Sequence, residues 1–554
     1  MSTILLIKKG GENVNTVLLE WRPYTSLFQR NSLGLQYIAA TLRQNGYKTH
    51  IQVFEGEAVE EVCRQVLQLK PDIVAIPIYP EIKDTVYAIF DHIKESDPNI
   101  TTISGGHTAT LYAAKIMKEQ KNIDLITCGE SEEIYLELCR NIEKKQSIEN
   151  VKGIFYRKNN LILKTGPREQ IKDLNVLPFP VDDITKDLND DTSPTVFTSI
   201  SSSRGCLGNC DFCVSHRVSK IVKNAKWRGR DPESIIEEIK CIISNFPGKR
   251  IAIEFVDSSF EDPDPRNKSR ILKFVDLLES NDIKIAFSFL TRAESWSEKD
   301  TDLIKRMRKC GLFRVSPGFE SGSEASLISF GKRASVENNY KAYEVFSKNG
   351  VDVCGLIIMF HPYVTFNDLR NNAKFIVDIG LGHRPQSWLH SLYVFPDTRI
   401  FHRIAMDGLL IGTDKSQFVY LYSFNDGRME KLYKTVERLK RLPVVDDFEN
   451  TCEKISYELK LYEVWKEQYD EFEKVRDIMD EYINSFKKTS KIVSERLNEM
   501  FLELVELAEA RKILHKEEKI IEEWNHLLEE KHNYLESEWV RFRVKLLRKG
   551  IRLI

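Results

Sequence analysis

The chain has 554 residues, of which 42% are hydrophobic and 30% are charged, and its formal net charge is -2. This length suits three or four domains of ordinary size, each with its own core. The near-neutral charge gives no reason to expect a nucleic-acid partner. The apolar run at 4–7 is too short for a signal peptide, and the run at 351–360 is about half of a membrane span. We therefore expect a soluble, cytoplasmic protein.

Residues 1–144 read as strands alternating with helices. Strands are expected at 3–7, 49–54, 73–78, 101–104 and 125–127, and helices at 35–44, 57–69, 83–95 and 109–118. This alternation predicts an open parallel sheet in a Rossmann-like or flavodoxin-like domain. Such a domain binds its ligand beyond the carboxyl ends of the strands.

A second β/α series is expected at 193–411, after a linker at 145–192 that carries a short β-like piece at 153–157 and the run Leu177-Pro-Phe-Pro180. Six strands are expected, at 195–202, 251–256, 284–290, 313–318, 352–359 and 387–395. Six such units predict a partial (β/α)6 barrel related to the TIM barrel, with its site at the carboxyl ends of the strands.

The remaining residues, 412–554, read as an all-α cap, which we expect to close over the mouth of the barrel. The last segment, 539–554, interleaves six Lys and Arg residues with apolar ones. Such a tail can touch a membrane surface or an anionic partner, although more often it is a solvated helix end.

Three of the ten cysteines, Cys206, Cys210 and Cys213, follow the first expected barrel strand in a Cys-x3-Cys-x2-Cys loop. Thiolates are soft ligands suited to iron–sulfur clusters. Three of them hold three irons of a 4Fe-4S cluster and leave the fourth iron open for chemistry. The other seven cysteines lack ligand spacing and are expected to be small buried side chains.

Structural zinc is the competing interpretation of this loop. His216 lies three residues after Cys213 and completes a formal Cys3His set. Zinc sites, however, usually pair two ligand arms that are far apart in sequence, whereas these four residues lie within eleven. The cluster is the favoured interpretation.

Several stretches, taken in order, resemble the cobalamin-dependent radical S-adenosylmethionine enzymes over roughly residues 1–400. They are Leu33-Gly34-Leu35, Pro71-Asp-Ile-Val74, Ser104-Gly-Gly-His107, Gly129-Glu130, Leu177-Pro-Phe-Pro180, Ser203 to Cys213 with Gly205 and Phe212, Trp227-Arg-Gly-Arg-Asp-Pro-Glu233 and Gly318-Phe-Glu-Ser-Gly322. The resemblance implies three cofactors: a 4Fe-4S cluster on the three cysteines, S-adenosylmethionine and cobalamin. It also implies an external electron donor of the flavodoxin or ferredoxin type.

The residues expected to bind cofactors lie on both domains. On the first domain they are Gly34, Ser104, Gly105, Gly106, Gly129 and Glu130, with the cobalamin nucleotide tail implied near the glycines at 105–106. On the barrel they are Phe212, Ser288, Arg292 and Glu320, with Glu320 a partner for S-adenosylmethionine. Salt bridges and caps explain Arg292, and likewise Asp257, equally well. Pro317 departs from the expected pattern and leaves the strand end beside it open.

The motif Asp-x-His-x-x-Gly is missing from the first domain, and its first loop (8–33) has no histidine. Cobalamin is therefore expected to bind without a histidine ligand from that loop, and His107 is expected to be a helix-start residue.

The leading hypothesis for the reaction is methylation of an unactivated carbon or phosphorus centre of a small molecule, peptide or lipid. The alternatives are a non-methylating radical rearrangement or cyclisation, and a zinc-stabilised binding module. Methylthiolation of tRNA is disfavoured because the first domain lacks a second cysteine triad.

Overall fold

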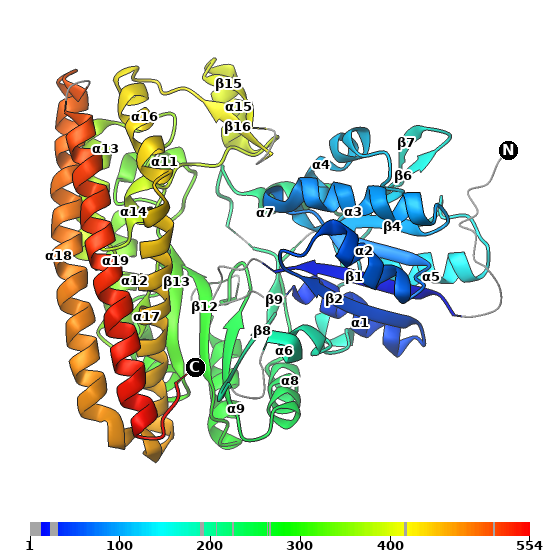
Figure 1. Ribbon diagram of the computed structural model, residues 1–554, viewed down its shortest axis with the longest axis horizontal. Coiled ribbons are helices and arrows are strands. Elements are labelled where there is room, and N and C mark those ends of the chain that lie inside the picture. The colour runs from blue at the N-terminus through cyan, green and yellow to red at the C-terminus, as the bar shows by residue number, and fades with distance from the viewer. Residues whose placement is uncertain are drawn as a thin grey trace.

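The structure is a computed structural model that describes residues 13–22, 32–188, 193–206, 208–223, 226–262, 264, 267–414, 418–513 and 516–553, without the side chains of 187, 188, 216, 219 and 220. Three parts follow one another across the molecule: an α/β domain at one end, a partial barrel in the middle and a bundle of long helices at the other end (Figure 1). The strand expected at 3–7 lies outside the described residues.

The first domain is built on a 7-stranded sheet in the order β2-β1-β3-β4-β5-β6-β7. Its parallel strands are β1 (Asn15–Trp21), β2 (Lys48–Phe54), β3 (Ile73–Pro77), β4 (Thr101–Gly105) and β5 (Leu125–Thr127). The order 2-1-3-4-5 is that of the flavodoxin type, whose ligands bind where the strand order reverses, at β1 and β3. The segment 145–192 adds the antiparallel strands β6 (Ile154–Lys158) and β7 (Leu161–Lys164) to the sheet edge.

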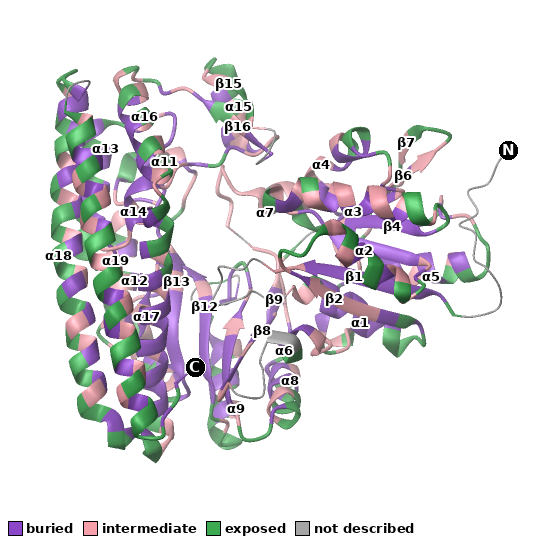
Figure 2. Ribbon diagram, in the orientation of Figure 1, coloured by how far each residue is buried: buried purple, intermediate pink, exposed green. Residues whose placement is uncertain are grey.

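Helices cover both faces of this sheet, and the strands between them are buried (Figure 2). Helices α1 (Leu33–Gln44) and α5 (Glu132–Glu143) pack on one face. Helices α2 (Val59–Gln68), α3 (Lys83–Ser96) and α4 (Gly106–Glu119) pack on the other. The parallel strands are apolar on both sides because each side meets a helix layer.

The barrel is an open, all-parallel sheet in the order β14-β13-β12-β11-β8. The strands are β8 (Thr195–Ile200), β11 (Arg250–Phe255), β12 (Ala286–Arg292), β13 (Leu312–Gly318) and β14 (Asp352–Val353). The helices α8 (Pro232–Asn245), α9 (Ser269–Ser280), α10 (Thr301–Lys309), α12 (Val336–Ser347) and α13 (Phe366–Asp378) alternate with them.

Two expected barrel strands differ from the structure: 352–359 is a strand only at β14, with one further bridge at Ile357, and 387–395 is wrong in its first half. Pro385 starts a short helix, α14 (Pro385–Leu389), because proline fits the first turn of a helix. Only isolated bridges remain after it, between Phe360 and Ser391 and between Val394 and Tyr420. The barrel is therefore completed by single pairings and not by a full strand.

Four long helices form the bundle: α16 (Arg428–Lys440), α17 (Pro443–Gln468), α18 (Arg476–Glu509) and α19 (Glu517–Arg548). Helix α17 lies at the amino ends of the barrel strands, where Gln468 donates a hydrogen bond of 3.0 Å to the carbonyl of Ile285. The Arg250 guanidinium, at the start of β11, stacks 4.7 Å from the Trp465 ring. The expectation of a cap over the barrel mouth is therefore wrong for α17, which closes the opposite end.

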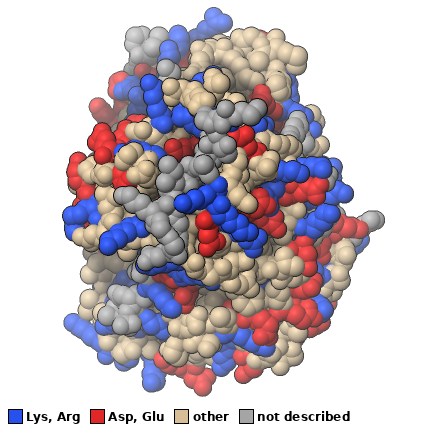
Figure 3. Space-filling model, turned by 90° about the vertical axis from the view of Figure 1, so that its right-hand side faces the viewer, with Lys and Arg blue, Asp and Glu red and all other residues tan. Residues whose placement is uncertain are grey.

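The C-terminal segment docks at this same amino end. The Thr195 hydroxyl donates to the carbonyl of Leu553 at 2.8 Å, and Arg250 donates to the carbonyl of Arg552 at 2.5 Å. Within the preceding basic helix, Lys545 pairs with Glu481 at 2.7 Å. No helix in the described ranges is long and apolar enough to cross a membrane. Positive and negative side chains are interspersed over the first-domain end of the molecule (Figure 3).

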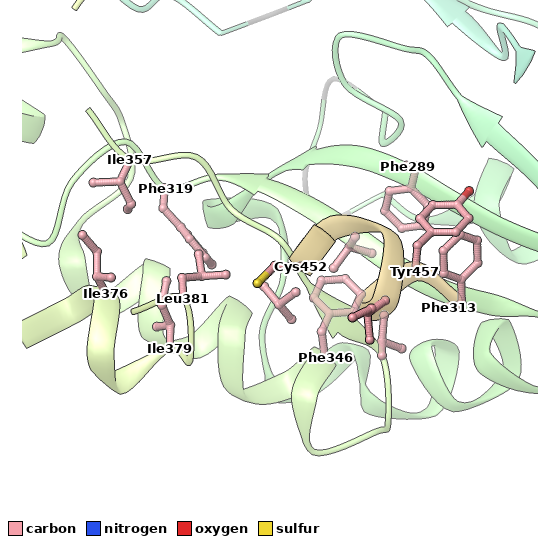
Figure 4. Packing of buried hydrophobic residues seen from close by; sticks show 14 of the residues in the cluster. Phe289, Phe313, Phe319, Phe346, Ile357, Ile376, Ile379, Leu381, Cys452 and Tyr457 are labelled. Atoms are coloured by element: carbon pink, nitrogen blue, oxygen red, sulfur yellow. The ribbon is translucent and has the colours of Figure 1, made fainter. Parts of the chain in front are cut away.

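Tyr457 of α17 fills the inside of the barrel. Its ring lies 4.9 Å from Phe313 of β13 and 6.0 Å from Phe197 of β8, so it contacts two strands well apart in the sheet. Figure 4 shows it among Phe289, Phe313 and neighbouring apolar side chains. Barrel and bundle consequently share one hydrophobic core.

Replacing Tyr457 with alanine should destabilise the barrel and the bundle together. Deleting a buried aromatic side chain costs about 3–5 kcal/mol, through lost burial and the cavity left behind. We expect a clear drop in the midpoint of thermal unfolding, measured by circular dichroism on the apoprotein. Ile492→Ala on the exposed side of α18, where the side chain is 38% accessible, is the control and should shift it little. Equal shifts for both variants would contradict the role of Tyr457 as a shared part of the barrel and bundle core.

Candidate functional site

The cysteine loop leaves the carboxyl end of β8, as the sequence predicts, and runs through β9 (Ser203–Arg204) to α7 (Val214–Ile221). The sulfurs of Cys206 and Cys210 both face Gly208: a Cβ there would lie 3.1 Å from one and 3.8 Å from the other. The Gly208 N–H donates to Cys206 Sγ at 3.2 Å. The loop thus brings two thiols together around Gly208, where a side chain would lie tightly against the Cys206 sulfur.

Burial raises the pKa of the Cys206 thiol and raises that of Cys210 to about 12. Thiolates in this loop therefore need positive charge close by, which cluster irons supply. In the described part of the chain, no three His, Cys, Asp or Glu side chains are grouped to hold a single metal ion. A cluster has no such requirement, because each cysteine binds a different iron. The His216 side chain lies outside the described residues, so the Cys3His set is not tested.

Asp257, directly after β11, anchors the start of the loop. Its carboxylate accepts hydrogen bonds from the Ser202 hydroxyl at 2.6 Å and the Ser203 N–H at 2.7 Å. Burial raises its pKa to about 6, and these hydrogen bonds oppose the rise. The sequence left Asp257 open between a site residue and a salt bridge. Its contacts make it a support of the loop.

A second carboxylate, Asp211, ties the middle of the loop to α15 (Arg399–Met406), nearly two hundred residues away. Its carboxylate forms an ion pair with Arg399, whose Nε lies 2.7 Å away, and accepts a hydrogen bond from Arg403 Nη2 at 2.5 Å. Its backbone N–H donates to Phe330 at 2.7 Å, and its carbonyl accepts from Ile400 at 3.0 Å. Phe212 adds an edge-on ring contact with Phe330 at 5.6 Å. No spacing rule in the sequence indicates this pairing.

Arg292 ends β12 at the barrel mouth, where the sequence placed a cofactor residue. Its guanidinium is held by the fully buried Glu261, with Arg292 Nε 2.8 Å from a carboxylate oxygen. Glu261 also accepts from the Thr291 hydroxyl at 2.6 Å and the Ser295 hydroxyl at 3.0 Å. Ser288, four residues before Arg292 on β12, is also buried. Arg292 is thus fixed by two hydrogen bonds, from its backbone N–H and its Nε, to a residue that the sequence did not single out.

Glu320 stands just beyond β13 in a left-handed conformation, with φ of 62°. Its carboxylate lies 3.5 Å from the buried ammonium of Lys332, which also donates to the carbonyl of Gly318 at 2.7 Å. Burial is the largest effect on the Cys210 pKa and raises it, and the positive charge of Lys332 is the main effect that opposes this rise. Cys210, Glu320 and Lys332 therefore form one group at the mouth, and sequence reasoning missed the lysine.

In the first domain, the predicted glycines form the turn from β4 into α4. A Cβ on Gly105 would lie 2.6 Å from the Thr127 hydroxyl, and Gly106 has φ of 83°, so this turn requires both glycines. The Ser104 hydroxyl is buried and donates to the carbonyl of Ile76 at 2.8 Å. Gly34 faces open space in the first turn of α1. His107 lies in the first turn of α4, with an exposed side chain.

The other predicted pair, Gly129 and Glu130, contacts the barrel domain. A Cβ on Gly129 would lie 2.7 Å from Val222, at the end of α7. Glu130 pairs with Arg228 at 2.6 Å and with Arg204, two residues before Cys206, at 3.7 Å. The carboxyl edge of the first sheet therefore meets both flanks of the cysteine loop.

Glu20, near the end of β1, was missed by sequence reasoning. It is 5% accessible, and one of its carboxylate oxygens has no hydrogen-bond partner. Burial raises its pKa to about 8, against hydrogen bonds with Ser32 and Tyr79. These residues lie at β1 and β3, where the strand order reverses. The sequence held one indication of it, namely a charged residue within an otherwise apolar strand.

The residues present fit the three cofactors that the resemblance implies. The cysteine loop can supply three soft ligands, and the β4–α4 turn offers close backbone approach at a helix start. A separate cavity of about 420 Å³ lies between α4 and the hairpin of β15 (Leu410–Asp414) and β16 (Val419–Tyr422). It contains none of the predicted site residues.

Two family models match the chain, the radical SAM superfamily over 200–376 and the B12 binding domain over 26–139. Among curated relatives, an uncharacterized methyltransferase of Pyrococcus horikoshii is 24% identical over 74% of this chain and 85% of its own length. An anaerobic magnesium-protoporphyrin IX monomethyl ester cyclase of Rubrivivax gelatinosus is 25% identical over 57% of this chain and 56% of its own. A putative methylthiotransferase of Methanocaldococcus jannaschii is 28% identical over 67% and 76%.

Two solved structures share the fold. The cobalamin-dependent S-adenosylmethionine radical enzyme OxsB, solved with aqua-cobalamin, has a TM-score of 0.65 at 18% identity, over 92% of this chain and 84% of its own. The radical S-adenosylmethionine methyltransferase TsrM from Kitasatospora setae, solved with cobalamin and a [4Fe-4S] cluster, has a TM-score of 0.57 at 14% identity, over 73% and 80%. The radical SAM domain implies S-adenosylmethionine and a 4Fe-4S cluster, and the B12-binding domain implies cobalamin.

Replacing Asp211 with asparagine should loosen the cysteine loop. It removes the anion that holds Arg399 and Arg403, and each hydrogen bond to a charged group is worth about 1.5–3 kcal/mol. After anaerobic reconstitution we expect fewer than half the wild-type iron and sulfide per chain, and faster iron loss to a chelator. Asp407→Asn, at the far end of α15, is the control and should load normally. Normal loading of the Asp211 variant would contradict its role.

Glu20 should make stability depend on pH. The folded chain keeps this carboxyl protonated up to a pKa of about 8, whereas the unfolded chain ionises it near 4.5. Folded protein thus binds the extra proton in this window, and stability falls as pH rises from about 4.5 to about 8. Glu20→Gln should be more heat-stable than wild type at pH 8, and the advantage should shrink toward pH 5. The exposed Glu81→Gln should show no such trend, and a pH-independent difference for Glu20→Gln would refute the raised pKa.

Proposed function

Because this chain belongs to the cobalamin-dependent radical S-adenosylmethionine enzymes, we propose that it is a methyltransferase acting on an unactivated carbon or phosphorus centre. One observation carries the proposal: the carboxyl edge of the first sheet, at Gly129 and Glu130, contacts both flanks of the cysteine loop. Two cofactors held at these edges would be neighbours. A shared substrate between them is the arrangement that methyl transfer requires.

The proposed reaction balances with two molecules of S-adenosylmethionine and two electrons. One gives up its methyl group and leaves S-adenosylhomocysteine. The other accepts one electron and breaks its sulfonium C–S bond, giving methionine and a 5′-deoxyadenosyl radical that removes a hydrogen atom from the substrate. The substrate keeps the methyl group in place of that hydrogen, and the second electron completes the new bond. An external flavodoxin-type or ferredoxin-type donor would supply both electrons.

When bound, the cluster supplies the electron for bond cleavage and cobalamin carries the methyl group. In this proposal Cys206, Cys210 and Cys213 hold the cluster. The residues of the barrel mouth, Ser288, Arg292 and Glu320 with Phe212 behind them, hold S-adenosylmethionine. On the first domain, Gly34 and the turn Ser104-Gly105-Gly106 would cradle cobalamin. The similarity to the Pyrococcus methyltransferase extends over 85% of that protein's length and supports the methyl-transfer interpretation.

A radical cyclisation or rearrangement without methyl transfer is the second candidate. It draws support from the names of relatives, among them the Rubrivivax cyclase and a 4′-phospho-dehydrooxetanocin synthase of Priestia megaterium that is 24% identical. The chain covers 56% and 44% of the lengths of these two proteins. Such a reaction needs the same loop but consumes no methyl group.

The two candidates differ in their products from S-adenosylmethionine. With reconstituted enzyme, cobalamin and reductant under anaerobic conditions, the methyltransferase should form both S-adenosylhomocysteine and 5′-deoxyadenosine. Replacing Cys206, Cys210 and Cys213 with alanine should abolish 5′-deoxyadenosine while cobalamin still binds. Cys241→Ala, at an exposed cysteine outside the loop, is the matched control. Formation of 5′-deoxyadenosine without any S-adenosylhomocysteine would favour the second candidate.

A further inference from the structure

We propose that Glu130 is a domain latch: its carboxylate, held between Arg204 and Arg228, fixes the position of the first domain against the cysteine loop and so sets the register between the two cofactors. The inference rests on the proposed function for its consequence in catalysis. The latch itself rests only on contacts between described residues.

Arg204 and Arg228 lie directly opposite each other in the two-residue ribbon formed by β9 and β10 (Arg228–Gly229). Cross-strand partners project to the same side, and like charges in this position repel. An anion between the two guanidinium groups offsets this repulsion. Glu130 provides this anion, 2.6 Å from Arg228 and 3.7 Å from Arg204.

Glu130 is positioned for this contact from several directions. Arg228 grips both of its oxygens, at 2.6 and 3.1 Å, and the Ile171 N–H donates to it at 2.9 Å. Burial opposes ionisation, but these hydrogen bonds and the two arginines lower its pKa. The carboxylate is therefore charged at neutral pH, and its side chain is only 16% accessible.

Neighbouring residues extend the same contact. Arg204 also pairs with the buried Glu132, in the first turn of α5, at 2.6 Å, and stacks 5.0 Å from the Tyr37 ring of α1. Gly129 brings the backbone close to Val222 at the end of α7. The first domain thus grips the residues before Cys206 and the helix after Cys213 with one short segment.

This polar contact matters because the large hydrophobic cluster of the barrel and bundle does not extend into the first domain, although Phe418 of the β15–β16 hairpin joins a first-domain cluster. The barrel and the bundle belong to one hydrophobic cluster, whereas the first domain has its own clusters on the two faces of its sheet. Across this boundary Phe418, in the loop between β15 and β16, packs on Tyr112 of α4 at 4.9 Å. Ion pairs, unlike apolar contacts, impose a definite orientation on what they join. The Glu130 latch hence helps to set the angle and distance of docking, beside contacts of the linker such as Lys223 with Glu169 at 2.8 Å.

The test compares a step within the barrel with a step across the domains. Cleavage of S-adenosylmethionine to 5′-deoxyadenosine by a chemical reductant uses the barrel alone. Formation of S-adenosylhomocysteine, with cobalamin as the first methyl acceptor, needs both domains in register. In Glu130→Gln, the first rate should stay within about twofold of wild type and the second should fall at least about tenfold, since a shift of about 1 Å can cost that much or more.

Hydrogen exchange of the apoprotein gives a readout that needs no cofactor. Peptides covering 201–206 and 226–230 should exchange faster in Glu130→Gln, because the ribbon loses the anion that holds it. Glu133→Gln is the matched control: the residue lies three positions after Glu130, in the first turn of α5, is 54% accessible and pairs with Arg168 at 2.7 Å. It should change neither the exchange nor the ratio of the two products.

A second variant, Arg228→Lys, separates loss of the latch from loss of the fold. Lysine keeps the positive charge but cannot bind both carboxylate oxygens at once. It should lower the ratio of S-adenosylhomocysteine to 5′-deoxyadenosine while thermal stability stays near that of wild type. Unchanged exchange and an unchanged ratio in Glu130→Gln would overturn the latch. Equal loss of both products in Arg228→Lys would overturn it too. If wild type forms no S-adenosylhomocysteine, the proposed methyl transfer fails, and hydrogen exchange alone decides on the latch.

Discussion

A buried carboxylate between two facing arginines, Glu130 with Arg204 and Arg228, is the constraint on which the site depends. Breaking such a group by removing one partner leaves a charge uncompensated in a poorly solvated place, at a cost of several kcal/mol. The three residues come from both α/β units, so this cost enforces the docking of one unit on the other. Arg204 lies two residues before Cys206, and the constraint therefore reaches the cysteine loop directly.

The cysteine loop itself is held by residues that are distant in sequence. Asp257 secures its start, Asp211 ties its middle to Arg399 and Arg403, and Phe212 packs on Phe330. Few of its supports are local turns. A loop that must present three thiols to one cluster gains its precision from this shell, because a site set on a flexible loop alone would be too loose to position its ligands.

Features that depend on a local pattern of residues could be predicted from the sequence. The β/α alternation, the cysteine spacing and the glycines at 105 and 106 each have a cause within a few residues, and the fold and the turn agree with them. Long-range pairings leave no such trace. Lys332 beside Glu320, Asp211 with α15, and Glu261 beneath Arg292 depend on how distant segments meet. The interpretation of 387–395 as a strand failed at Pro385, because apolar residues there fit a short helix equally well, and the site roles of Gly34, Ser104 and Ser288 stay predictions.

The placement of α17 leaves the surroundings of the cysteine loop to other elements. Tyr457 packs in the barrel interior, and Trp465 and Gln468 lie at the amino ends of β11 and β12, away from the cysteine loop. On the side of the cysteine loop, Asp211 contacts α15, whose Phe401 packs on Tyr420 of the hairpin β15–β16. The same hairpin carries Phe418 onto Tyr112 of α4, so a chain of contacts runs from the cysteine loop through α15 and the hairpin back to the first domain that Glu130 contacts.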